Sequence, residues 1–307
     1  MDRHGMKHVF SGLDRTGNTA AAPYCPSARI TMFERSIAIT THDLVSGAVR
    51  RPAISVLLSL DDTPFSISIN DVPAPKARAF IVRELAPRAI QALNCQLLSL
   101  SLDPGHPLFL STRKALGDKE FLALPDGPLR ACRDPLREEL LGTVPRQPDD
   151  RLIEALLSSA PDFSPHLREK SASRREDLLA EFESLWTEPH LASKLATAMD
   201  LSVSRLSHLF VEEVGVPLRT YTLWRKYRHA CARLQSPGSM STLAQDCGFS
   251  DAAHMTRTFV SYLGFSPITV KSLSHIHRPA EAHRAGGGAA GRGNTRNHSR
   301  CSAQVNV

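Results

Sequence analysis

The sequence lacks the patterns that would assign it to the common enzyme and metal-binding classes. Its six cysteines include no C-x-x-C pair, and its Cys and His residues show no spacing of the zinc type. It also contains no paired-carboxylate constellation, nucleophile elbow or phosphate loop. We therefore expect a protein that is not an enzyme and that uses no metal or other cofactor.

Long apolar runs are absent as well. No run of about 18 apolar residues could span a bilayer, and the N-terminal segment has no continuous apolar core of the signal-peptide kind. These absences predict a soluble, cytoplasmic protein without a membrane partner. At 307 residues the chain is long enough for two domains with buried cores.

Positive charge gathers toward the C-terminal end. Residues 1–188 carry 23 Lys and Arg against 25 Asp and Glu, whereas residues 189–270 carry eight against five and residues 271–307 carry six against one. This distribution indicates that only the rear part of the chain meets a polyanion.

Residues 29–110 have the pattern of a small β domain. The segments are short, alternate between apolar and polar residues, and are broken by Pro, Asp and Asn. Phe65, Ile67 and Ile69 are expected to share one face. Short strands without long helices between them favour an antiparallel sandwich or a small barrel.

Residues after Pro107 are predicted to be helical. The segment 149–160 places Leu152, Ile153 and Leu156 on one face, which either buries within the fold or pairs two chains, so a homodimer stays open. From residue 274 onward the chain is Gly, Arg, Asn and Ser with almost nothing to bury, which predicts a disordered basic tail.

An internal repeat carries the most information. Each copy reads as a helix, a tight corner whose residue tolerates a positive φ, a serine N-cap and a second helix. The offset between the copies is 48 residues up to Ser202 and 49 from Leu206 onward. The equivalent pairs are Leu195 and Leu243, Ala196 and Ala244, Asp200 and Gly248, Ser202 and Ser250, Leu206 and Met255, Phe210 and Phe259, and Gly215 and Gly264.

This repeat has the layout of two helix-turn-helix units. In each copy a polar face is left outside the packed one, as in recognition helices whose first turns enter a major groove. The segment between the copies predicts a linker helix that begins near Pro217 and ends at Pro237-Gly238. The alternative is a plain helical bundle. If both units meet one face of DNA, their recognition helices lie about 34 Å apart, one duplex turn.

The segments "LSVSRLSHLFVEEVGVPLRTY", "LWRKYRHACARL" and "GFSDAAHMTRTFVSYLGFSP" resemble the DNA-binding domain of the AraC/XylS family of bacterial transcription regulators over about residues 187–271. The resemblance implies double-stranded DNA and RNA polymerase as partners, and a cytoplasmic bacterial protein that associates with the nucleoid when bound. One departure is Lys271, where the family usually has arginine.

Carried over by position, the resemblance implies two sets of contact residues. The base contacts are expected from Ser204, Ser207, His208, Ala253, Thr256 and Arg257, and the backbone contacts from Ser202, Arg205, Arg225, Lys226, Ser250 and Lys271. Arg257 can donate a bidentate pair to guanine, so we expect the second unit to set much of the specificity. Arg205, Arg225 and Lys226 are alternatively ordinary solvated charges.

The front domain is similar to the cupin-like companion domains of the same family. The only histidines between residues 29 and 110 are His42 and His106, so a metal-binding cupin site is not expected. A small-molecule effector is the family-level implication, and a domain that binds only a protein partner is the alternative. The protein is then either an activator, which we favour, or a repressor or co-regulator.

The expected fold class is α+β in two domains, a small β-sandwich or cupin-like domain followed by an all-α domain with two helix-turn-helix units joined by a linker helix. The expected segments are a disordered N-terminus (1–28), the β domain (29–120), a helical linker or dimerisation segment (121–172), the DNA-binding domain (173–273) and the disordered tail (274–307).

Overall fold

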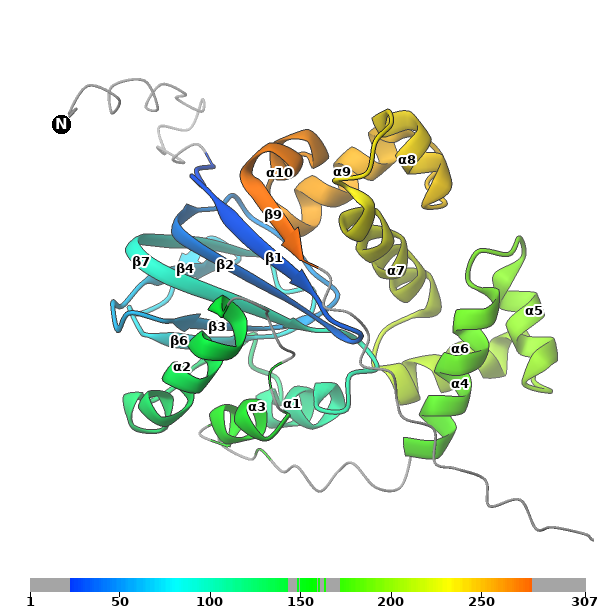
Figure 1. Ribbon diagram of the computed structural model, residues 1–307. Coiled ribbons are helices and arrows are strands. Elements are labelled where there is room, and N and C mark those ends of the chain that lie inside the picture. Colours follow the sequence, from blue (N-terminus) through cyan, green and yellow to red (C-terminus); the bar gives the residue numbers. More distant parts are fainter. Residues whose placement is uncertain are drawn as a thin grey trace, which may run out of the picture.

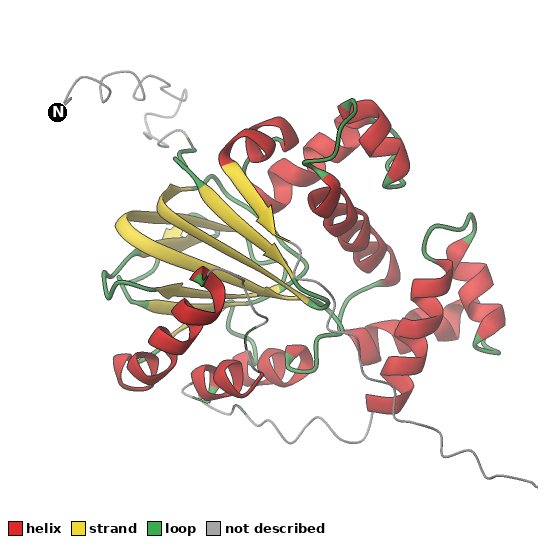
Figure 2. Ribbon diagram, in the orientation of Figure 1, coloured by secondary structure: helices red, strands yellow, loops and turns green. Residues whose placement is uncertain are grey.

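The computed structural model describes residues 23–142, 148, 150–158, 160, 163 and 172–277. Within them the chain forms a β-sheet domain followed by a helical region, as Figures 1 and 2 show. This arrangement confirms the expected fold class, a β domain followed by two helix pairs that a longer helix joins.

One curled sheet makes up the β domain. Its strands run in the order β8-β6-β3-β7-β2-β1-β9, and β4 and β5 extend from β7. All strand pairs are antiparallel except β1 with β9. The strands are β1 (Ala28–Met32), β2 (Ser36–Val45), β3 (Ile54–Ser59), β4 (Ser66–Ile69), β5 (Val72–Pro73), β6 (Ala79–Val82), β7 (Arg88–Leu102), β8 (Phe121–Ala123) and β9 (Ser274–His277).

The long strand β7 gives the sheet its curl. Its first residues pair with β4 and its last residues pair with β3, while β2 lies along both parts with a register shift after His42. The sheet therefore encloses a core of its own, to which Phe65, Ile67 and Ile69 belong, each at most 3% exposed. That confirms the predicted shared face.

The opposite face of the sheet is covered by helices. Val56 and Leu58 point into a core shared with helices, whereas Leu57 between them lies in the enclosed core, as the two-residue period of a strand requires. The covering helices are α1 (Phe109–Leu116), α2 (Asp126–Leu141) and α3 (Asp150–Leu157). Of the two alternatives for the apolar stripe of α3, the structure has burial within the fold, with Ile153 and Leu156 each 1% exposed.

The remaining helices form the helical region, on the side of the molecule away from β4 (Figure 1). They are α4 (Ala172–Leu185), α5 (Leu191–Ala198), α6 (Val203–Val214), α7 (Leu218–Arg233), α8 (Met240–Asp246), α9 (Ala252–Leu263) and α10 (Pro267–Leu273). None of the described helices is long and apolar enough to cross a membrane.

Helix α7 belongs to two hydrophobic cores. Its first part contributes Tyr221 to the core that contains α4, α5 and α6. From Trp224 to Leu234 it contributes to a second core that contains α8 and α9 together with Ile30 and Ile37 of the sheet. One helix thus holds both helix pairs and ties the second of them to the β domain.

Polar contacts tie the second helix pair to the sheet as well. The buried Arg228 of α7 donates to the carboxylate of Asp103 and to the carbonyl of Phe33. Arg51 donates from Nε to the carbonyl of Tyr262 at 2.5 Å. Burial raises the pKa of Asp103, and the Arg228 guanidinium opposes that shift.

The structure corrects three expected segment boundaries. Residues after Pro107 were expected to be helical, but Phe121–Ala123 form β8, which pairs with β6, so the sheet extends past residue 120. The tail was expected to be disordered from residue 274, but Ser274–His277 form β9, which pairs with Ala28–Thr31 of β1. A free strand edge supplies the hydrogen bonds that these four residues could not make alone. At the other end, Tyr24 bridges to Val45 inside the segment that was expected to be disordered. Residues 1–22 and 278–307 of the two terminal segments lie outside the described residues.

Replacing Arg228 by methionine should lower the free energy of unfolding by about 3–5 kcal/mol, because the Asp103 carboxylate would stay buried without its partner. Urea unfolding of the full chain measures the loss. The matched control is Arg233→Met, which breaks an exposed pair with Asp246 and should cost about 0–1 kcal/mol. Equal losses in the two variants would contradict the role given to Arg228.

Candidate nucleic-acid interface

The first helix pair consists of α5 and α6. The chain turns between them at Asp200, which has a φ of 52°, and the Leu201 amide donates to the Ala196 carbonyl at 2.8 Å. Ser202 is the N-cap of α6, and its hydroxyl accepts from the Arg205 amide at 3.2 Å. The corner and the cap both confirm the prediction from sequence.

The second pair, α8 and α9, repeats this geometry. Gly248 turns the corner with a φ of 74°, and the Phe249 amide donates to the Ala244 carbonyl at 2.9 Å, 48 residues after the matching bond of the first pair. Both second helices end at a glycine in the left-handed region, Gly215 and Gly264. The repeat seen in the sequence is therefore a repeat of structure.

The predicted N-cap of α9 is wrong by one residue. Asp251, and not Ser250, caps the helix, and its carboxylate accepts from the His254 amide at 2.6 Å. That hydrogen bond lowers the pKa of Asp251. The extra residue of the second copy falls at the cap, so Asp251 is the structural equivalent of Ser202. Ser250 supports the cap by donating to the Asp251 carboxylate at 3.0 Å.

The packed faces of α6 and α9 are equivalent. Leu206 and Phe210 in the first helix, and Met255 and Phe259 in the second, are all 0% exposed. Each helix is therefore held by its inner face, and its outer face is left for contacts.

The outer faces carry the residues that the sequence nominated for base contacts. Ser204, Ser207 and His208 are exposed on α6, and Ala253 and Arg257 are exposed on α9. Thr256 is half-buried. At an offset of 49 residues the exposed Arg205 corresponds to the half-buried His254, a position that the sequence reasoning did not nominate. The near-repeat was the signal that could have pointed to it.

Two hydroxyls on these faces have the same hydrogen bond. Ser207 donates to the Val203 carbonyl and Thr256 donates to the Ala252 carbonyl, both at 2.8 Å and both one turn back in the helix. Their hydrogens are engaged, so toward an outside group these oxygens act as acceptors.

The residues nominated for backbone contacts have different surroundings. Arg205 is exposed, whereas Arg225 is bound to the Glu183 carboxylate at 2.6 Å. The Lys226 side chain lies over the corner of the second pair, where a Cβ added to Gly248 would be 3.3 Å from its Cε, and burial lowers its pKa. Lys271 lies in the last turn of α10, with Nζ 3.4 Å from the Ser236 carbonyl oxygen.

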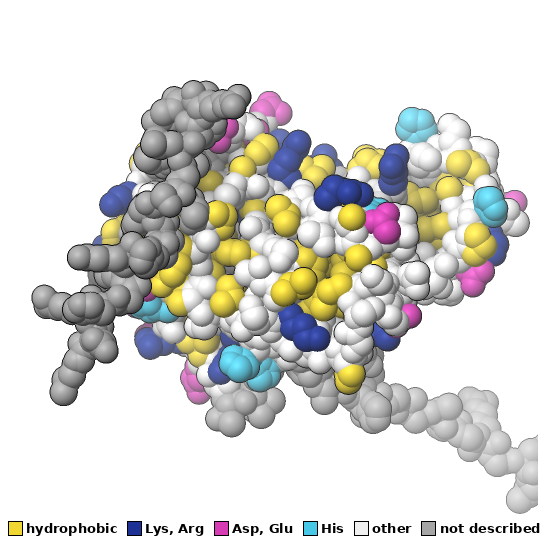
Figure 3. Space-filling view, turned by 90° about the horizontal axis from the view of Figure 1, so that it is seen from above, with side chains coloured by type: hydrophobic (Ala, Val, Ile, Leu, Met, Phe, Trp, Pro, Cys, Tyr) yellow, Lys and Arg dark blue, Asp and Glu magenta, His cyan; other side chains and the backbone are white. Residues whose placement is uncertain are grey.

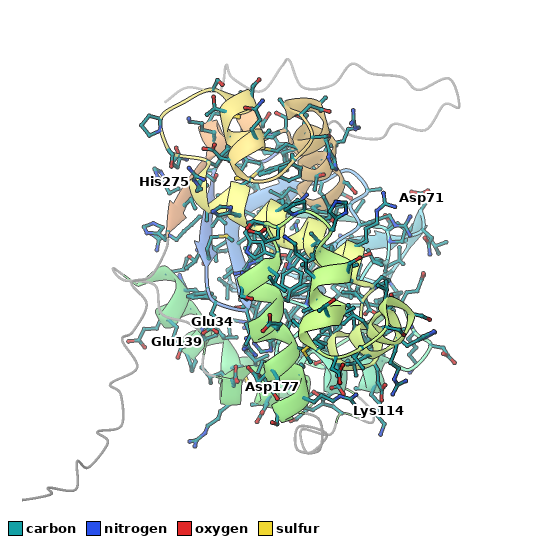
Figure 4. The ribbon with its side chains drawn as sticks, turned by 90° about the vertical axis from the view of Figure 1, so that its right-hand side faces the viewer. Glu34, Asp71, Lys114, Glu139, Asp177 and His275 are labelled. Atoms are coloured by element: carbon teal, nitrogen blue, oxygen red, sulfur yellow. The ribbon has the colours of Figure 1, made fainter. Side chains whose placement is uncertain are left out.

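The two helix pairs lie on one side of the molecule, with α7 between them (Figure 1). Figure 4 looks onto this side, with the first pair below the second. On the upper face, which Figure 3 shows, Lys and Arg side chains stand singly among polar and hydrophobic side chains. On that face the cations do not form one dense basic patch.

Comparison with known proteins agrees with this geometry. Residues 195–272 match the family model described as "Helix-turn-helix domain". No curated protein matches the sequence.

Several solved structures are similar to the chain. ToxT from Vibrio cholerae, bound to an unsaturated fatty acid, has 10% identity and a TM-score of 0.46, covering 79% of this chain and 98% of its own. The C-terminal domain of the response regulator yesN from Fusobacterium nucleatum has 24% identity and a TM-score of 0.30, covering 32% and 98%. An AraC-type transcriptional regulator from Chromobacterium violaceum has 22% identity and a TM-score of 0.30, covering 33% and 94%.

Alanine substitutions at the helix caps distinguish the roles of Ser202 and Ser250. Ser202→Ala should lower the free energy of unfolding by about 1 kcal/mol, because the Arg205 amide loses its acceptor. Ser250→Ala leaves the Asp251 cap in place and should cost clearly less, while Asp251→Ala should cost more than Ser250→Ala. Chemical denaturation of the three variants measures this order, and a larger loss for Ser250→Ala than for Asp251→Ala would restore Ser250 as the cap.

Proposed function

Since residues 195–272 are an AraC-type helix-turn-helix domain, we propose that the chain is a sequence-specific transcription regulator that inserts α6 and α9 into successive major-groove segments of double-stranded DNA. The observation that carries this proposal is the repeated geometry. Two helix pairs share their corner, cap, buried anchors and back-bonded hydroxyl, and one helix joins them.

The outer residues differ in how much sequence information they can read. Arg257 is exposed and can donate two parallel hydrogen bonds to a guanine, which discriminates by about 1–3 kcal/mol against another base. His208 holds the equivalent position on α6 and offers a ring nitrogen to a base or a phosphate. Ala253 can only touch a thymine methyl group. The second unit therefore contributes most of the specificity.

The hydroxyls read bases as acceptors. Ser207 and Thr256 have their hydrogens engaged by carbonyls of their own helices, so they favour the amino groups that cytosine and adenine present in the major groove. The Ser204 hydroxyl is short and exposed, and it adds a permissive contact.

The backbone contacts position the two units on the duplex. Arg205 and Lys226 supply charge, and Ser202 brings a hydroxyl to the N-terminal end of α6, where amide groups favour a phosphate. Ser250 offers a hydroxyl at the start of α9, where a phosphate would compete with the Asp251 carboxylate that caps the helix. Lys271 adds a cation at the end of α10. Arg225 contributes least among the nominated cations, because a phosphate would compete there with the Glu183 carboxylate.

The β domain supplies the regulation. We assign it a small-molecule effector, because a cavity opens between its sheet and α9, α10 and β9, lined by Ile39, Leu97, Phe265 and Val270 among others. The chain acts as an activator that contacts RNA polymerase, in the cytoplasm. The apolar face of α3, with Ile153 and Leu156, is buried within the fold, so a homodimer would form through another surface. The second candidate is a repressor or co-regulator whose β domain binds a protein. A ligand that raises the thermal stability of the full chain favours the first.

Alanine substitutions distinguish a residue that recognises a base from one that contacts the DNA backbone. Arg257→Ala should relax the preference at one base pair, whereas Lys226→Ala should weaken binding to every sequence alike and lower the slope of log K against log salt by about one. Gel-shift titrations of the full chain against upstream DNA fragments at several salt concentrations measure both quantities.

Lys119→Ala is the matched control, because Lys119 is an exposed cation of the β domain. It should leave both the preference and the salt slope unchanged. If Arg257→Ala and Lys226→Ala both weakened all sequences equally, the assignment of roles would be wrong. A full chain with no preference over random competitor DNA would defeat the proposed function itself.

The spacing of the two units can be tested on the DNA. Inserting about five base pairs, half a turn, between the two contacted segments should reduce binding to that of one unit. An insertion of about ten base pairs should not restore binding, because α7 is packed in both cores and cannot lengthen. Full affinity at ten base pairs would show that the units move independently.

A further inference from the structure

Two arginines lie inside the β domain, and neither has a carboxylate partner among the residues that the structure describes. Arg51 is 6% exposed and Arg88 is 1% exposed. The hydrogen bonds of their guanidinium groups within the part of the chain that the structure describes go to hydroxyls and to a carbonyl. A buried guanidinium stays charged, so such a pair calls for a counter-ion.

The two guanidinium groups share one strip of serines. Arg51 donates from Nη1 to the hydroxyls of Ser99 and Ser101, each at 3.2 Å, and Arg88 donates from Nη2 to the hydroxyl of Ser55 at 2.7 Å. Ser55 of β3 is the cross-strand partner of Ser101 of β7. The arginines therefore converge on adjacent strands.

Donor groups remain unused at this place. Nε and Nη1 of Arg88 are buried and have no hydrogen-bond partner among the described residues. Burial lowers the pKa of Arg88, and the positive charge of Arg51 lowers it further. Each of the two charges therefore raises the free-energy cost of burying the other. An anion would both accept from these donors and offset the two charges.

A cavity between the sheet and α9, α10 and β9 reaches Arg51. Arg88 lies next to this cavity, because its backbone pairs with that of Val49, and both Val49 and Ile90 belong to the cavity lining. The cavity has room of about 60 Å³, and its lining includes Arg51, Ser99 and Thr41 together with apolar residues such as Ile39 and Leu97. A water needs about 10–15 Å³ of such room, so the space suits about four waters or one small oxyanion.

We propose that Arg51 and Arg88 form a binding site for a small oxyanion, a carboxylate or phosphate group held between the two guanidiniums above Ser55, Ser99 and Ser101. The proposal names the chemical group of the effector that this site would bind, and it rests on the proposed function. The site also adjoins the second recognition helix. Arg51 donates to the Tyr262 carbonyl in the last turn of α9, and the Arg50 amide donates to the Ser261 carbonyl at 2.8 Å.

Thermal unfolding of the full chain tests the site with acetate, inorganic phosphate and the neutral acetamide, at constant pH and ionic strength. The Tm of the wild type should rise with acetate or phosphate until it saturates, because the anion binds only the folded state, and acetamide should have no effect. The arm that responds at the lower concentration identifies the anion as carboxylate or phosphate.

Arg88→Met provides the decisive comparison. Without added anion its Tm should exceed that of the wild type, because the variant removes a buried charge that has no partner. Its half-saturating anion concentration should be about tenfold higher or more, because a charge-assisted contact is lost. Arg50→Met, which changes an exposed neighbour in the same loop, should respond as the wild type does.

Ser55→Ala keeps both arginine charges, and it is the second test variant if Arg88→Met fails to fold. It frees the remaining Arg88 amino group and should leave saturation by the anion intact. Equal Tm values of the wild type in acetate, phosphate and acetamide would overturn the proposal, and so would the same anion response in Arg88→Met. No DNA enters this measurement, so its failure is distinguishable from a failure of DNA binding in the gel shift.

Discussion

The packing of α7 in two hydrophobic cores at once is the constraint on which the rest of the structure depends. Tyr221 packs with the first helix pair, and from Trp224 onward the same helix packs with the second. Its 16 residues span about 24 Å, with buried side chains from Tyr221 near one end to Cys231 near the other. Two small helix pairs with little core of their own thereby acquire one fixed relation, which the proposed contact with two groove segments requires.

The β domain touches both pairs where their recognition helices end. A Cβ added to Gly215 would lie 2.5 Å from Cε1 of Phe109, and a Cβ added to Gly264 would lie 3.4 Å from Cγ1 of Val49. Both glycines also have a positive φ, so no other residue fits these turns without strain. Arg113 adds a hydrogen bond to the Gly215 carbonyl at 2.7 Å. The β domain is therefore in contact with the C-terminal end of each of these helices, through α1 at the first pair and through the loop at Val49 at the second.

The β domain makes more extensive contacts with the second helix pair than with the first. Strand β9 continues from α10 into the sheet, and Arg228 and Arg51 join buried groups of α7 and α9 to the β domain. The first pair meets the domain mainly through apolar packing on α1. A change inside the sheet has a shorter physical path to α9, which carries the strongest candidate for base reading, than to α6.

Local patterns in the sequence determined the two helix pairs. The corners, the Ser202 cap and the buried anchors depend on residues within about one helical turn of each other, and such short-range preferences can be read without the fold. The order of a β domain followed by helices also followed from the change of apolar period. The cap of α9 was misassigned because an offset that grows from 48 to 49 does not say where the extra residue falls.

Only the tertiary structure decided what happens between distant residues. The pairing of β9 with β1, of Arg225 with Glu183 and of Arg228 with Asp103 joins positions that lie between 42 and more than 240 residues apart. The convergence of Arg51 and Arg88 on one serine strip likewise depends on the register of β3 and β7. Charge and hydrogen-bonding capacity are visible in a sequence, but which groups meet, and whether water reaches them, is set by packing of the whole chain.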